Sequence, residues 1–241
     1  MNASQTARQR ARAELTREIK QEARRQLGAA GAQQLSLRAV ARQLGMVSSA
    51  LYRYFPSRDD LLTALIIDAY DALGASAESA FDQAASKDAR TRWRAVCQAV
   101  RSWAIGHPHE YALIYGSPVP GYRAPQETVA PAARVPAVLG QILQDAWTAE
   151  RPGASPPARD EPSPGSAGLS PVLAAQAAIV AGAIAPDVPE PLILRALIAW
   201  TQLFGMISFE LFGQLVGSVD PSDDFFRYTV EQMATFILLE P

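Results

Sequence analysis

The chain has 241 residues, of which 49% are hydrophobic, so it can bury a core as one large domain or as a small domain joined to a larger one. Its only cysteine, Cys97, excludes an intrachain disulfide and fits a reducing cytoplasm, and the polar, arginine-rich N-terminal stretch predicts no secretory signal. The net charge of -2 hides an asymmetry: residues 1–58 carry 11 Lys and Arg against 3 Asp and Glu, whereas residues 59–241 carry 11 against 21. Either a solvated basic helix or a surface for a polyanion explains this excess.

The first predicted helix spans residues 11–30, and Gly31 ends it. Its apolar residues recur every four positions and form one narrow stripe: Leu15, Ile19, Ala23 and Leu27.

A second, short helix is expected to begin after Ser36, which stands at the N-cap position, and to end at Gly45. Its buried side has helical spacing and consists of Leu37, Val40, Ala41 and Leu44. A third helix follows a turn of about three residues and stops at Pro56. We expect its apolar side to contain Val47, Leu51 and Phe55.

The other face of the third helix is polar and consists of Ser48, Ser49, Tyr52 and Arg53. Two helices joined by a tight turn with glycine are typical of a helix-turn-helix. A helix that enters the major groove of DNA needs hydroxyl and guanidinium groups for base edges and phosphates. Ser36 and Arg38 begin the second helix, where a helix N-terminus can meet a phosphate. Each residue alone is more simply a solvated side chain, but the set within a basic segment favours DNA binding.

A fourth helix is predicted from Ser57, with Asp59 and Asp60 in its first turn and a capping interaction between Ser57 and Asp60. Its buried side is Leu61, Leu62, Leu65 and Ile66. Further helices are expected at residues 88–106, 109–116, 132–150 and 171–185, with Cys97 half-buried in the first of them. Residues 150–171 are rich in Pro, Gly and Ser and predict a mobile loop.

Residues 191–217 are apolar nearly all round and predict one long helix. Its longest uncharged run, Ala196 to Phe209, has 14 residues, fewer than the roughly 20 that cross a bilayer, so we expect no membrane insertion. A helix with one side in its own core and another against a second chain is the better interpretation. With the amphipathic last helix it predicts a dimer interface formed by Phe209, Phe212, Phe226, Val230, Met233 and Ile237.

The stretch SLRAVARQLGMVSSALYRYFPSRDDLL, residues 36–62, closely resembles the N-terminal module of TetR-family transcriptional regulators. The resemblance implies an all-α homodimer with an N-terminal three-helix helix-turn-helix domain, residues 1–58, linked by the helix from residue 57 to a larger C-terminal ligand-binding and dimerisation domain, residues 59–241. Such proteins bind a palindromic operator in double-stranded DNA and usually repress transcription until a small-molecule effector binds. By position, the resemblance implies that Tyr52 and Tyr54 contact phosphate, that Arg53 reads a base or phosphate, and that Arg58 clamps the DNA backbone.

The sequence departs from the family pattern at three positions. Val47 stands where a small hydroxyl cap is common, which moves capping to Ser48, and Ser48 replaces a frequent lysine. Residues 102–122 and 199–213 resemble the Trp-His-Gly type of TetR C-terminal domain, but Phe204 replaces the histidine before Gly205. This replacement implies a more apolar effector.

The C-terminal aromatic residues either belong to the plain core or line one cavity for a mostly apolar ligand: Trp103, Tyr111, Tyr115, Trp147, Trp200 and Phe204. His107 and His109 supply at most two metal ligands, so we expect a surface turn, no metal and no cofactor. The sequence shows no nucleophile motif or phosphate-binding glycine loop, so an enzyme is not expected. Two alternatives remain open: a helical carrier or enzyme without specific DNA binding, and an architectural DNA-binding protein without an effector.

Overall fold

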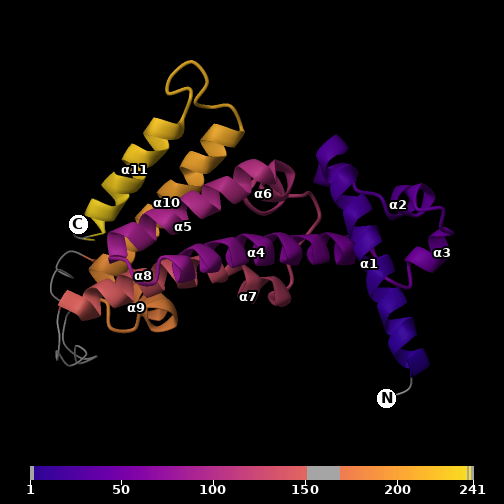
Figure 1. Ribbon diagram of the computed structural model, residues 1–241, viewed down its shortest axis with the longest axis horizontal. Helices are drawn as coiled ribbons and strands as arrows, with labels where there is room; N and C mark the ends of the chain where they lie inside the picture. Colours follow the sequence, from indigo (N-terminus) through magenta and orange to yellow (C-terminus); the bar gives the residue numbers. More distant parts are fainter. Residues whose placement is uncertain (1–2, 151–168, 238, 240–241) are drawn as a thin grey trace. The chain divides into compact units, whose positions relative to one another are not determined.

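The computed structural model describes residues 3–150, 169–237 and 239, and within these ranges it is all-α, without a strand (Figure 1). The predicted mobile loop at residues 150–171 falls almost entirely outside the described residues. The α-helices are α1 (Ala3–Ala30), α2 (Leu37–Gln43), α3 (Ser48–Leu51), α4 (Arg58–Gln83), α5 (Ala89–Gly106), α6 (Pro108–Tyr115), α7 (Val129–Ala132), α8 (Arg134–Glu150), α9 (Pro171–Ile184), α10 (Glu190–Leu211) and α11 (Asp223–Phe236).

The chain forms two compact units, each built from two segments. The first comprises residues 1–71 and 107–131, and the second comprises residues 72–106 and 132–241. This division differs from the linear boundary at residue 58 because α6 packs against α1 in the first unit. Helix α4 contributes its first half to the first unit and its second half to the other.

The core of the first unit combines the predicted apolar stripes of the first four helices. Ile19 and Ala23 are fully buried, and so are Val40 and Ala41. Side chains from α3, from the turns after it and from α4 complete this core: Leu51, Phe55, Leu61, Leu62, Leu65 and Ile66. Burying these apolar surfaces drives the packing of helices too short to be stable alone.

Both ends of α2 carry the predicted caps. The Ser36 hydroxyl accepts a hydrogen bond from the Ala39 N–H at 3.4 Å, which satisfies a free donor at the helix N-terminus. At the other end Gly45 has φ +66°, and the Met46 N–H donates to the Ala41 carbonyl at 2.8 Å. This Schellman arrangement favours glycine at the left-handed position, because a residue without a Cβ adopts it at no steric cost.

The third helix is shorter than predicted, and Val47 does not lie on its apolar side. Helix α3 is one turn, Ser48–Leu51, and the chain continues in tight turns to Phe55. Val47 is the extended residue before α3 and is 69% exposed, because a residue outside the helix does not follow its periodicity. No side chain caps α3, so the expected transfer of the cap to Ser48 is wrong.

In the second unit, α5 packs against α8, α10 and α11, and α9 packs against α8 and α10. Cys97 is completely buried in α5 rather than half-buried, and burial raises the pKa of its thiol. Helix α10 ends at Leu211, six residues before the predicted end at 217. Gly213 has φ +76°, and the Gln214 N–H donates to the Phe209 carbonyl at 2.8 Å, which closes the helix in a second Schellman arrangement.

Among the described helices, α10 is long and apolar enough to cross a membrane by length and composition. Its inward face is buried in the second unit: Leu192, Ile193, Ala199, Leu203, Phe204, Met206 and Ile207. Core helices of soluble proteins share these features, and packing explains the apolar residues on the inward face of α10.

Candidate nucleic-acid interface

The polar face predicted for the third helix is present and exposed. Ser48, Ser49 and Arg53 are exposed, and Tyr52 is 41% exposed. Leu51 between them is completely buried, so α3 is anchored to the core by its opposite side. A polar surface held by a packed apolar side is suited to enter a groove of DNA without changing shape.

A shallow pocket of about 430 Å³ brings Ser36, Arg38, Tyr52 and Arg58 together at the start of α2 and α4. Its other lining residues are Leu35, Leu37, Pro56 and Ser57. Hydroxyl and guanidinium groups converge there from segments that are apart in the sequence, and these groups donate hydrogen bonds to phosphate oxygens. The other predicted DNA contacts, Ser48, Ser49, Arg53 and Tyr54, lie outside this pocket along α3 and the turns after it.

The start of α4 has the predicted capping interaction. The Ser57 hydroxyl accepts from the Asp60 N–H at 3.1 Å and donates to the Asp60 carboxylate at 2.7 Å. This arrangement differs from the usual capping box, in which the acidic side chain accepts from the N-cap backbone N–H.

Arg58 has an intramolecular role that the sequence did not indicate. Its Nε donates to the Leu35 carbonyl at 3.2 Å, and its Nη2 donates to the Ala32 carbonyl at 2.8 Å. These bonds tie the first residue of α4 to the connection between α1 and α2. Arg58 therefore helps to fix the position of Ser36 and the start of α2, and its contact with DNA stays a prediction.

Arg12 on α1 contacts the turn that follows α3. Its guanidinium lies 5.1 Å from the centre of the Tyr54 ring and donates to the Arg53 carbonyl at 3.3 Å. Tyr54 is partly buried against the core of the first unit, so it is less accessible than Tyr52. The contact of Arg12 could have been predicted from its helical spacing to Leu15, which places both residues on the side of α1 that faces the core.

Two sets of basic residues in the first unit differ in their partners. Lys20 and Arg24 bind Asp68 at 2.7 and 2.6 Å, and Arg24 also pairs with Glu110 at 3.0 Å, so these cations join α1 to α4 and α6. A second group is exposed and has no acidic partner within the described ranges: Arg8, Arg10, Arg38, Arg42 and Arg53. The second group can bind a polyanion without first breaking an ion pair.

The predicted pocket aromatics are divided between the two units. In the first unit the rings of Tyr111 and Tyr115 are 5.2 Å apart, and burial raises the pKa of Tyr115. In the second unit the Trp200 and Phe204 rings are 6.0 Å apart, while Trp103 is buried and Trp147 is half-buried. The buried Trp200 Nε1 has no hydrogen-bond acceptor among the described residues.

The predicted dimer-interface residues separate into an exposed pair and a buried group. Phe209 and Phe212 are 57% and 47% exposed. The α11 residues are in the core of the second unit with at most 4% exposure, which corrects the expectation that they meet a partner: Phe226, Val230, Met233 and Ile237. The sequence pattern identified the apolar face of α11, but this face packs against the chain's own helices.

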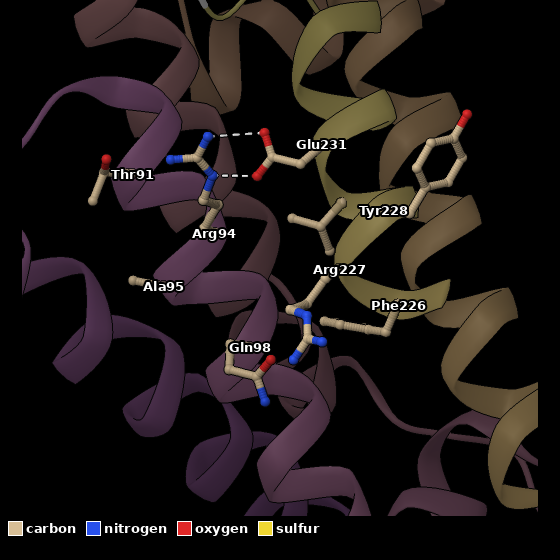
Figure 2. Close-up of a pocket in the computed structure, with 9 residues that line it drawn as sticks. Thr91, Arg94, Ala95, Gln98, Phe226, Arg227, Tyr228 and Glu231 are labelled. Carbon is tan, nitrogen blue, oxygen red and sulfur yellow. Dashed lines mark hydrogen bonds and ion pairs between the residues drawn. The ribbon is translucent and has the colours of Figure 1, made fainter. Parts of the chain in front are cut away.

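A groove of about 630 Å³ lies between α5 and α11 in the second unit (Figure 2). At one end the Arg94 Nη2 donates to the Glu231 carboxylate at 2.9 Å, and this bond holds the pKa of Glu231 below its ordinary value. Figure 2 shows Arg227, Gln98 and Phe226 toward the other end. Sequence patterns did not predict this groove, because its two sides, α5 and α11, are more than a hundred residues apart in the chain.

The second unit also contains a buried arginine. The Arg101 side chain is 6% exposed and pairs with Glu210 at 2.6 Å and with Asp223 at 2.9 Å, so it connects α5 to α10 and α11. His107 and His109 are both exposed. Within the described part of the chain, no cluster of three or more His, Cys, Asp or Glu residues could hold a metal ion.

Two family profiles match the chain. The profile described as "Bacterial regulatory proteins, tetR family" matches residues 19–65, and the profile described as "Tetracyclin repressor-like, C-terminal domain" matches residues 93–233, more than half of the chain. The chain belongs to the TetR family. It is a TetR-family transcriptional regulator with a helix-turn-helix DNA-binding domain, as the sequence predicted.

Individual relatives are also regulatory proteins by name. The HTH-type transcriptional regulator Rv1816 of Mycobacterium tuberculosis is 49% identical over 120 residues, which cover 50% of this chain and 51% of Rv1816. The chain thus matches about half the length of this curated relative. The crystal structure of SCO4313 has a TM-score of 0.74 and 33% identity, covering 94% of this chain and 98% of SCO4313.

A more distant TetR-family structure shares the fold. The TetR family transcriptional regulator PfmR from Thermus thermophilus has a TM-score of 0.53 and 18% identity, with 92% of this chain and 99% of PfmR covered. The resemblance of the C-terminal domain to the Trp-His-Gly type stays a prediction.

Proposed function

We propose that this TetR-family regulator is a cytoplasmic homodimeric repressor that leaves a palindromic operator when a mostly apolar small molecule binds its C-terminal domain. The observation that carries the proposal is the exposed polar face of α3 above the buried Leu51. This face contains Tyr52 and Arg53, whose phenol and guanidinium can donate to phosphate oxygens and guanine acceptors.

A symmetric dimer allows two copies of α3 to read two half-sites. Successive major grooves on one side of DNA are roughly 34 to 36 Å apart, so two copies held at that separation bind a palindrome. An effector that binds more tightly to a dimer whose two α3 helices have another separation weakens DNA binding. The loss in DNA-binding free energy equals the difference between the effector's binding free energies for the two dimer geometries.

The outer face of α10 supports dimer formation. Ile198, Phe209 and Phe212 lie on one side of this helix and are 55%, 57% and 47% exposed. Gly205 lies between them on the same side, and a Cβ added there would contact no described atom of the chain. An exposed apolar strip of this kind favours burial against a second copy.

The aromatic residues of the second unit support a mostly apolar effector. Trp200 and Phe204 are packed edge to face, and the buried Trp200 Nε1 is a hydrogen-bond donor that a ligand oxygen could satisfy. By the resemblance to the Trp-His-Gly type, Phe204 stands in place of a histidine, which leaves one polar group fewer for a ligand.

Selection of bound fragments from random DNA, followed by titration at two salt concentrations with candidate effectors, tests the proposal. A palindromic motif, salt-dependent affinity and release by an apolar compound are expected. Binding without release by any compound would contradict the effector, and absence of binding to every duplex would contradict the repressor. Sizing of the Phe209→Asp variant should show a folded monomer, and an unchanged dimer mass would contradict the α10 interface.

A further inference from the structure

Helix α1 is longer than its packing requires. It begins at Ala3, yet residues 7–14 are all exposed, Leu15 is only partly buried, and Ile19 is the first completely buried residue. Figure 1 shows these N-terminal turns continuing past α3. The hydrophobic core therefore does not explain why the chain is helical before Leu15.

The inward stripe of α1 changes from aliphatic residues to arginines where the helix leaves the core. Arg8 and Arg12 are four residues apart and precede Leu15 and Ile19 at helical spacing, so the four lie on one side of α1. Arg12 shows what this side contacts, because its guanidinium donates to the Arg53 carbonyl after α3 and lies over the Tyr54 ring. The side of α1 that faces the core is thus also the side that faces the turn after α3, at Arg53 and Tyr54.

Arg8 extends this side by one turn beyond Arg12. Its Cα is about 6 Å farther along the helix axis. Arg8 is exposed and has no acidic partner among the described side chains, and the nearest acidic residue in the sequence, Glu14, pairs with Arg17. Arg10 is equally exposed but lies on roughly the opposite side of the helix, at 100° per residue.

We propose that the first turns of α1 form a phosphate-binding arm, in which Arg8 contacts the DNA backbone that flanks the half-site read by α3 and Arg12 is a positioning residue that orients the arm. The proposal rests on the proposed function of operator binding. Arginine on a phosphate adds affinity and salt dependence without reading sequence, so the arm lengthens the bound site and leaves the motif unchanged.

The pair Arg8→Gln and Arg10→Gln tests the arm, because both variants remove one exposed positive charge from the same helix. Operator affinity is measured from about 50 to about 200 mM salt on a duplex with long flanks. Because the dimer carries two copies of Arg8, Arg8→Gln should make the slope of log affinity against log salt shallower by about 1.8, so that its affinity deficit relative to the unmodified chain shrinks about 12-fold over this range. Arg10→Gln should change the slope much less.

A duplex trimmed to the selected motif gives an independent readout. Without flanking phosphates, the unmodified chain and Arg8→Gln should bind with the same slope. Equal behaviour of the two variants, or an Arg8→Gln deficit that persists on the trimmed duplex, would overturn the arm. The unmodified chain separates the two proposals: if it binds the motif, an unaffected Arg8→Gln rejects only the arm, whereas if it binds no duplex, operator binding fails and the arm with it.

Discussion

The arginines of the two units differ in what they contact. In the second unit, the following arginines each pair with a carboxylate of another segment or of their own helix: Arg90, Arg92, Arg94, Arg101, Arg134 and Arg227. In the first unit, Lys20 and Arg24 pair with Asp68, and Arg17, Arg25 and Arg58 pair with carboxylates near them in the sequence, whereas five arginines have no acidic partner among the described residues: Arg8, Arg10, Arg38, Arg42 and Arg53. Arg195 of the second unit lies over the Phe236 ring. The net charge of a segment is therefore less informative than the pairing of its charges.

Pairing explains why the same side chain has different roles in the two units. A buried guanidinium such as Arg101 must have its charge and donors satisfied within the protein, so it joins helices. An exposed guanidinium without a partner loses little on binding phosphate and releases counterions from DNA when it does.

The largest effect is expected on the face of α3. Tyr52→Ala and Arg53→Ala should each abolish specific operator binding because they remove the donors that we propose for the DNA contact, while substitution at exposed positions leaves the fold intact. Fluorescence anisotropy measures operator binding, and circular dichroism measures whether the helical fold is intact. Arg227→Ala is the matched control, since this exposed arginine of the second unit pairs with Asp224. Intact binding by both α3 variants, or equal loss in the control, would break the comparison.

A large stability effect is expected from the paired group. Arg101→Met leaves the Glu210 carboxylate without its main partner in a largely buried place, so the free energy of unfolding should fall by about 3 kcal/mol. Arg38→Met, at an exposed position in the first unit, should change it by about 0.5 kcal/mol or less. Denaturant unfolding measures both variants, and similar losses would show that pairing does not distinguish the two sets.

Arg58 sharpens the comparison, since it lies in the first unit but is engaged internally. Arg58→Gln removes donors to the Leu35 and Ala32 carbonyls, so stability should fall by about 1 kcal/mol and operator affinity should weaken as the start of α2 loosens. The salt dependence of binding should stay the same. A slope shallower by about 1.8, for the two copies of Arg58 in the dimer, would instead place Arg58 on a phosphate, as the family resemblance implies.

The smallest effect is an acid dependence of stability. The Arg101 hydrogen bonds hold the pKa of Glu210 below its ordinary value of 4.5, so this carboxylate stabilises the fold above that pH and loses its contribution as the pH falls toward its lowered pKa. Glu210→Gln should therefore show a shallower fall in unfolding free energy below pH 4.5. Urea titrations from pH 3 to 7 test this, and identical pH profiles would contradict the role of Glu210.

Local sequence patterns predicted much of the fold and the exposed polar face of α3. The stripe of Ile19 and Ala23, the Ser36 cap and the Gly45 turn were all readable, because they depend on neighbours within one or two turns. The predicted end of α10 lay six residues beyond the observed one, although Gly213 is a residue type that commonly ends a helix. Val47 was misplaced because the periodicity was extended beyond the first residue of α3.

The sequence by itself determined that the chain is helical, which side of each helix is apolar and which segment resembles a TetR helix-turn-helix. Only the tertiary structure decided which surface each apolar side meets and which arginines are already paired: Phe226 is in the core while Phe209 is exposed, and Arg58 binds carbonyls while Arg53 is without an acidic partner among the described residues. The physical reason is distance along the chain. Periodicity reports on residues a turn apart, whereas burial and ion pairing depend on helices that are brought together only when the whole core forms.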